Sequence, residues 1–124
     1  MSDILNQTVS AFNNRNFVVA GKLAAEGLAA AQGRDELFWM GLLETCEGYE
    51  LLGRKQDLEA ERKLISSMQK LRNFGFRYRN FEITVALAGI RLAVEHIRMV
   101  RDGRHKVFDV SLHPTLRLAA KADD

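Results

Sequence analysis

Proline, the residue that interrupts helices most strongly, occurs only once in this chain of 124 residues, at Pro114. Residues that are compatible with a helix dominate the sequence before it, so clusters of glycine and asparagine are the main signals that can end a segment. Such a sequence is typical of helices joined by short turns. We therefore expect an all-α protein built from antiparallel helical hairpins.

The glycine and asparagine clusters divide the chain into five expected helices, each with apolar residues at helical spacing. Ser2 or Asp3 is the expected N-cap of the first helix, Asp35 is that of the third, and Gly33 is the expected C′ residue after the second. We expect helices at about residues 3–13, 17–31, 36–52, 57–73 and 80–102, an extended stretch at 106–110 and a last short helix at 115–121.

Small residues recur on one side of the expected third helix. Gly41, Thr45 and Gly48 follow one another at steps of four and three residues. Residues at these steps lie on the same face of a helix. The spacing predicts a narrow groove into which a neighbouring helix packs.

The fifth expected helix is apolar on two nearly opposite sides. A helix of this kind either lies at the centre of its own domain or uses its second stripe to bind another subunit. Both alternatives stay open. The second stripe is covered either by other parts of the same chain, or by a second copy in a homodimer or another protein partner. The first stripe is Phe81, Val85, Ala88, Leu92 and Met99, and the second is Ile83, Leu87, Ile90, Val94 and Ile97.

Length and composition indicate one soluble domain over residues 1–124, with a less regular C-terminal extension at 106–124. Hydrophobic residues make up 47% and charged residues 27% of the chain, which is typical of a globular protein without a membrane span. No secretory signal is visible, and the single cysteine, Cys46, excludes an intrachain disulfide. We expect a cytoplasmic protein. The net charge of +2 names no partner.

Two fragments resemble known helical-hairpin proteins. Their spacing is similar to that of tetratricopeptide-type hairpins, and more narrowly to a microbial family catalogued as domain of unknown function three hundred and nine, over roughly residues 10–75. The fragments are Phe12-Asn13-Asn14-Arg15-Asn16-Phe17-Val18-Val19-Ala20 and residues 37–53, which contain Gly41-Leu42-Leu43 and Tyr49.

That family continues its first motif with His-Glu, then another Glu and a Trp. The corresponding positions here are Gly21, Lys22, Ala25 or Glu26, and Leu28. The polar signature is missing, so the resemblance implies the fold and carries no metal-binding or catalytic role onto this chain.

Carboxylates and histidines are the groups in this chain that could bind a metal or transfer protons. Glu44, Glu47 and Glu50 lie at three-residue steps, but the Glu-x-x-His spacing of helical di-metal sites is absent, which favours a solvated acidic flank. An enzyme would require His96 and one of Glu44, Glu47 or Glu95 to meet in a single pocket. We prefer a chain with no catalytic residue, no metal ligand and no cofactor.

Two basic clusters suggest an alternative function. Arginines occur at Arg72–Arg79, interleaved with Phe74, Phe76 and Tyr78, and again at Arg91 and over Arg98–Lys106. Arginines that contact phosphates and aromatic rings that stack on bases are typical of sites for single-stranded nucleic acid. The nearly neutral overall charge and the acidic residues close to these arginines weaken this alternative.

The function that we prefer is a non-enzymatic scaffold or adaptor that binds a protein partner and also associates with itself as a homodimer. Helical hairpins that stack side by side form grooves that accept peptides or partner helices. The candidate groove or rim residues are Trp39, Tyr49, Phe74, Phe76, Arg77, Tyr78, Arg79, Arg91 and Arg98.

Overall fold

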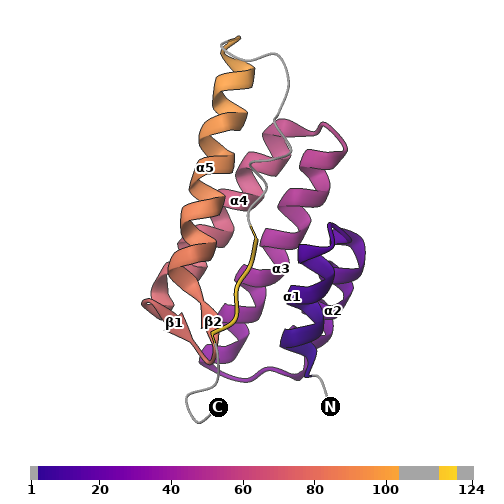
Figure 1. Cartoon of the computed structure of the whole chain (residues 1–124), viewed down its shortest axis with the longest axis vertical. Helices are drawn as coiled ribbons and strands as arrows, with labels where there is room; N and C mark the ends of the chain where they lie inside the picture. Colours follow the sequence, from indigo (N-terminus) through magenta and orange to yellow (C-terminus); the bar gives the residue numbers. More distant parts are fainter. Residues whose placement is uncertain (1–2, 104–114, 120–124) are drawn as a thin grey trace.

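A computed structural model describes residues 3–103 and 115–119, and in these ranges the chain is all-α apart from a two-stranded hairpin (Figure 1). The expected fold class and its five main helices are confirmed. The elements are α1 (Ile4–Asn13), α2 (Phe17–Ala30), α3 (Arg34–Gly53), α4 (Asp57–Leu71), a 3-10 turn η1 (Arg72–Phe74), β1 (Arg77–Tyr78), β2 (Phe81–Glu82) and α5 (Ile83–Arg101).

Each helix packs on the next one along the chain. α1 packs on α2, α2 on α3, α3 on α4, and α4 on α5. α3 therefore has helices on two sides, whereas α5 lies at the edge of the array (Figure 1). None of the helices described here is both long and apolar enough to cross a membrane.

The helical hairpins α1–α2 and α3–α4 use the same turn. Arg15 after α1 and Lys55 after α3 have left-handed backbones, with φ of 64° and 63°. In both turns the next residue donates its N–H to a carbonyl five positions earlier, Asn16 to Ala11 and Gln56 to Leu51. The shared turn makes each pair of helices antiparallel and starts α2 and α4 at equivalent positions.

The predicted small-residue groove on α3 is confirmed, and α4 fills it. A Cβ atom on Gly41 would lie 2.9 Å from Leu71 Cδ2, and one on Gly48 would lie 2.6 Å from Leu64 Cδ2. Thr45 is buried between them and donates its hydroxyl to the Gly41 carbonyl at 2.9 Å. The lack of side chains lets α4 approach the backbone of α3.

Aromatic rings form two groups in the core. Phe38 contacts Trp39, Phe74, Tyr78 and Phe81, with ring centroids 4.9–5.8 Å apart. At the start of α2 a second group combines Phe12, Phe17 and Tyr49. Edge-to-face contacts dominate both groups, as expected from the charge distribution of aromatic rings.

The ends of the first three helices differ partly from expectation. Asp3 caps α1 as predicted, with its carboxylate accepting from the Asn6 N–H at 2.8 Å. The predicted roles of Asp35 and Gly33 are wrong. Gly33 precedes α3 with φ of 61°, and Asp35 lies in the first turn of α3, because its carboxylate binds the β-hairpin instead.

The expected last helix is also wrong in the part that is described. Residues 115–119 are extended, and Leu118 forms an antiparallel bridge with Phe81 of β2. Backbone partners on β2 and a buried position for Leu116 outweigh the local helix propensity of this segment. Residues 106–110, 120 and 121 and Ser2 lie outside the described residues.

Candidate interaction surface

A hollow of about 280 Å³ lies between α4 and α5. Its apolar members are Ile65 and Met68 on α4 and Leu87 on α5, all of them partly buried. Met68 has a flexible, polarisable side chain that adapts to differently shaped ligands. Gln69, Arg72 and Arg91 complete the lining.

Arg72 and Arg91 are exposed, and neither has an ion-pair partner among residues 3–103 and 115–119. Arg72 belongs to the 3-10 turn after α4, and Arg91 lies one helical turn beyond Leu87 on α5. The hollow therefore joins an apolar floor to two guanidinium groups that are available to an anion.

The other candidate arginines are paired within the chain. Arg77 Nε lies 2.8 Å from Glu82, and Arg79 Nη2 lies 2.9 Å from Asp35. Arg98 binds Glu61 on α4. Glu82 is one of the acidic residues that lie close to these arginines in the sequence, and it pairs with Arg77. The residues Arg104, His105 and Lys106 lie outside the described part of the chain.

Glu61 is a buried carboxylate that joins α4 to the C-terminal end of α5. Its oxygens accept from Arg98 Nε at 2.6 Å and from Arg101 Nη1 at 2.5 Å. Burial alone would raise the pKa of Glu61, but the hydrogen bonds and charges of Arg101 and Arg98 outweigh it and hold the pKa below its ordinary value. The cluster acts as a structural link between the two helices.

The β-hairpin is fastened to α3 by polar contacts. Tyr78 donates its hydroxyl to Asp35 at 2.9 Å, and Arg34 lies 4.5 Å from the centroid of the Phe74 ring. Burial, followed by the neighbouring Asp35 carboxylate, raises the pKa of Tyr78. These contacts hold Tyr78 against α3, and the ion pair with Asp35 ties the exposed Arg79 to the same helix.

Three predicted groove or rim residues belong to the core instead. Trp39, Tyr49 and Phe74 are buried, because Trp39 packs over Gly27 and the two other rings lie in the aromatic groups of the core. Their assignment to a surface is wrong. By contrast, Phe76 is 84% exposed and is the member of the predicted set that a partner can reach most easily.

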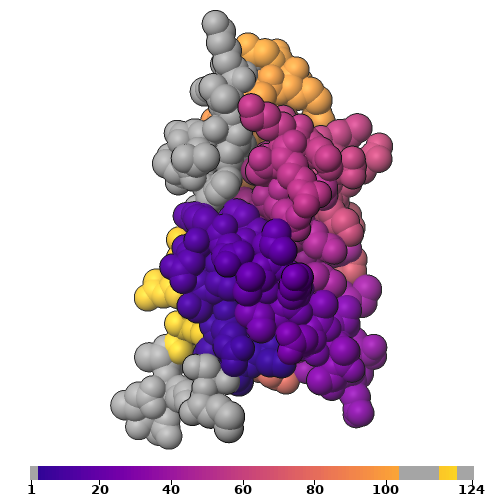
Figure 2. All heavy atoms as spheres, turned by 90° about the vertical axis from the view of Figure 1, so that its right-hand side faces the viewer, coloured from indigo at the N-terminus to yellow at the C-terminus, as the bar shows by residue number. Residues whose placement is uncertain are grey.

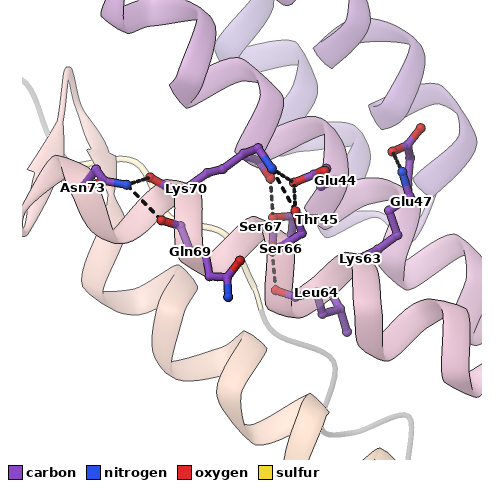
Figure 3. Close-up of polar contacts among 11 residues, drawn as sticks. Glu44, Thr45, Glu47, Lys63, Leu64, Ser66, Ser67, Gln69, Lys70 and Asn73 are labelled. Carbon is purple, nitrogen blue, oxygen red and sulfur yellow. Dashed lines mark hydrogen bonds and ion pairs between the residues drawn. The ribbon is translucent and has the colours of Figure 1, made fainter.

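The predicted acidic flank of α3 lies along a polar seam with α4 (Figure 3), and its three glutamates are partly exposed to solvent. Glu44 accepts from Lys70 at 2.9 Å and from Ser66 at 2.8 Å, and Glu47 pairs with Lys63 at 3.1 Å. Glu50 pairs with Arg54, which follows it by four residues at the end of α3. A shallow hollow of about 380 Å³ lies over this seam, lined by Glu44, Leu51, Glu59, Arg62, Lys63 and Ser66.

The groups required for the enzyme alternative are not brought together in these hollows. His96 is buried on α5 and lines neither of them, whereas Glu44 and Glu47 face α4. Burial raises the pKa of the Cys46 thiol to about 12, so the reactive thiolate is strongly disfavoured. Among the described residues, no group of three or more His, Cys, Asp or Glu residues is placed to hold a metal ion.

The two stripes of α5 have different environments. Ile83, Ile90, Val94 and Ile97 of one stripe are buried. On the other stripe, Leu92 is 46% exposed. Residues Val85 and Met99 are half-buried and Ala88 is exposed, so this stripe is only partly covered.

The hollow between α4 and α5 was only partly visible in the sequence. Arg72 and Arg91 stood out as members of basic clusters, but Ile65 and Met68 matched the core face of the fourth helix, and Leu87 matched a core stripe of the fifth. Half-burial at these three positions depends on how α5 packs on α4. No local pattern reports that packing.

Comparisons of this chain with protein-family models, with curated proteins and with solved structures found no match. The resemblance to the microbial family of unknown function and to tetratricopeptide-type hairpins therefore stays a prediction.

Proposed function

We propose that this chain is a helical protein-interaction module that binds an acidic amphipathic helix of a partner in the hollow between α4 and α5. The observation that carries the proposal is the combination of an apolar floor, Ile65, Met68 and Leu87, with two arginines that have no ion-pair partner in the described residues. A groove between two helices accepts the apolar face of a third helix.

The hollow is small, with a volume of about 280 Å³, which is near the lower end of the range of about 300–1,000 Å³ for small-molecule pockets. One or two apolar side chains of a partner helix fill such a space, and they gain about 25 cal/mol for each Å² of apolar surface removed from water.

The charges favour an acidic partner. A carboxylate can bind Arg72 or Arg91 without breaking an existing pair, whereas at Arg77, Arg79 or Arg98 it must displace a carboxylate of the chain itself. Arginine binds carboxylates through two parallel hydrogen bonds, which also orients the partner.

Charge reversal tests this function. The double substitution Arg72→Glu and Arg91→Glu should abolish capture of the partner that the unchanged chain retains from native lysate, as quantified by mass spectrometry. A matched control reverses two exposed lysines away from the hollow, Lys22→Glu and Lys55→Glu, and should retain the partner. Equal loss in both variants, or retention in both, contradicts the proposal.

Nucleic-acid binding stays an alternative prediction, which the exposed ring of Phe76 beside Arg77 favours. Binding of labelled single-stranded RNA at low salt, with affinity that falls steeply as salt rises, would support it. Absence of binding at low salt would remove it.

A further inference from the structure

The described C-terminal segment, residues 115–119, lies between α1 and β2 (Figure 1). We call the space that it fills between Asn13 and the β-hairpin the cleft. The side-chain amide of Asn13, at the end of α1, binds the backbone of Leu116 in this segment. Asn13 Nδ2 donates to the Leu116 carbonyl at 3.0 Å, and the Leu116 N–H donates to Asn13 Oδ1 at 3.0 Å. A side-chain amide thus reproduces the paired hydrogen bonds of a neighbouring strand.

On its other side the segment pairs with the β-hairpin. The Glu82 N–H donates to the Arg117 carbonyl at 2.9 Å, and the Ala119 N–H donates to the Asn80 carbonyl at 2.6 Å. Together with the two bonds of the Asn13 amide, four hydrogen bonds hold backbone groups of Leu116, Arg117 and Ala119. Addition of an extended segment to the edge of a sheet is a common mode of peptide recognition.

Alternate side chains of the segment enter the core. Leu116 is 1% exposed, Arg117 is exposed, and Leu118 is half-buried. Figure 2 shows the segment, coloured yellow, at the surface beside α1. The cleft therefore recognises an extended backbone with one leucine as its anchor, and the chain supplies its own ligand.

We propose that this cleft is a peptide-binding site that also accepts residues 115–119 of a second copy of the chain, so that two copies exchange these segments. The four hydrogen bonds come from Leu116, Arg117 and Ala119, which lie within a short segment that every copy carries. Exchange keeps each hydrogen bond and the burial of Leu116. The balance between the monomer, which binds its own segment, and the dimer, which exchanges segments, then depends mainly on protein concentration and on the chain that links the segment to α5. This inference does not depend on the hollow between α4 and α5.

Complementation between two defective variants of the full chain tests the exchange. Leu116→Asp damages the segment and leaves the cleft intact, whereas Asn13→Leu damages the cleft and leaves the segment intact. Each variant alone should have a mass of 14.0 kDa by light scattering, and an equimolar mixture at high concentration should contain a species of about twice that mass.

A third variant that carries both substitutions is the matched control. Mixed with Leu116→Asp it offers no intact segment, so no species above 14.0 kDa should form. A mixture of the two single variants that also stays at this mass overturns the proposal, and so does a dimer that forms equally with the doubly defective variant.

A second measurement covers the case in which Leu116→Asp loses helical structure. A labelled peptide with the sequence of residues 113–121 is added to this variant, and circular dichroism and fluorescence anisotropy are recorded. The peptide should bind and raise the Tm of the variant by several degrees. The same peptide carrying the Leu116→Asp substitution should do neither. If the unmodified peptide has no effect on either signal, the cleft does not act between molecules and the proposal fails.

Discussion

At the scale of single residues, two glycines determine how closely α3 and α4 approach. Leu64 and Leu71 of α4 occupy the space that side chains at Gly48 and Gly41 would fill. Both leucines are fully buried, so they cannot move aside at low cost. Close packing therefore outweighs the poor helix propensity of glycine at these positions.

Gly48→Ala should lower the free energy of unfolding by about 1–3 kcal/mol, although alanine favours a helix by about 1 kcal/mol over glycine. The new Cβ atom would lie 2.6 Å from Leu64 Cδ2 and would push α4 away from α3. Urea unfolding measures the change.

Gly53→Ala is the matched control, because nothing lies within 4 Å of the added Cβ atom at the end of the same helix. This variant should be as stable as the unchanged chain or slightly more so. Similar stabilisation by both substitutions would show that Leu64 does not limit the approach of α4.

At the scale of elements, Glu61 attaches the last turns of α5 to α4. Its carboxylate accepts from Arg98 and Arg101, which lie in the last turn of α5, where positive charge is also favourable to the helix dipole. The two arginines are about half exposed, so the link is accessible to solvent on one side. Its contribution to stability should be moderate and should depend on pH.

Glu61→Gln should lower the free energy of unfolding by about 1–2 kcal/mol near neutral pH, because the charge and the strong acceptors are lost. The pKa of Glu61 is lowered in the folded chain, so its carboxylate stabilises the fold above the ordinary value of 4.5. The stabilisation is lost as pH falls below 4.5 through the folded-state pKa. Urea unfolding of both proteins at several pH values should show the difference shrinking toward acid.

The control for this pH series is Glu59→Gln, which removes an exposed glutamate two positions earlier on α4. Its effect should be small at every pH. If the free energy of unfolding of Glu61→Gln stays below that of the unchanged chain by a constant amount down to strongly acidic pH, the carboxylate does not act through its charge.

At the scale of the whole molecule, the order of packing places α3 at the centre. α3 is covered by α2 on one side and by α4 on the other, whereas α5 packs on α4 and the β-hairpin. Amide groups in elements with few covered faces exchange with solvent by local opening, and those in the centre need global unfolding. Local unfolding should therefore begin at α5, which lies at the edge of the helical array.

Native-state hydrogen exchange should be slowest for backbone amides in the middle of α3, around Leu42 and Cys46, and faster by at least about tenfold for α5 beyond Ile97. Mass spectrometry of exchanged peptides, or NMR, measures the protection. Equal protection of the two regions would indicate that α5 opens only with the whole fold.

Much of the local structure follows from sequence patterns. Asp3 as N-cap, the turns after Asn13 and Gly53, and the groove formed by Gly41, Thr45 and Gly48 all depend on residues close together in the chain. The physical causes are equally local: capping of free N–H groups, backbone conformation at turns, and helical periodicity.

The candidate surface was less predictable, because burial depends on which neighbours cover a helix face. Trp39 and Tyr49 belong to an apolar face of α3, and only the positions of α1, α2 and α4 make them core residues. Similarly, Arg98 was a candidate interaction residue in the sequence, but it is neutralised by Glu61, which lies on another helix. Residues far apart in the chain leave no pairing signal in one sequence.

The sequence by itself determined the five main helices and the turns after α1 and α3, since its one proline lies at position 114 and its glycines and asparagines mark the breaks. Only the tertiary structure decided which arginines are left without a partner in the described chain, and that residues 115–119 form an extended segment instead of a helix. The reason is the range of the forces: helix propensity acts within a few residues, whereas the amide of Asn13 and the backbone of β2 reach this segment only after the chain has folded.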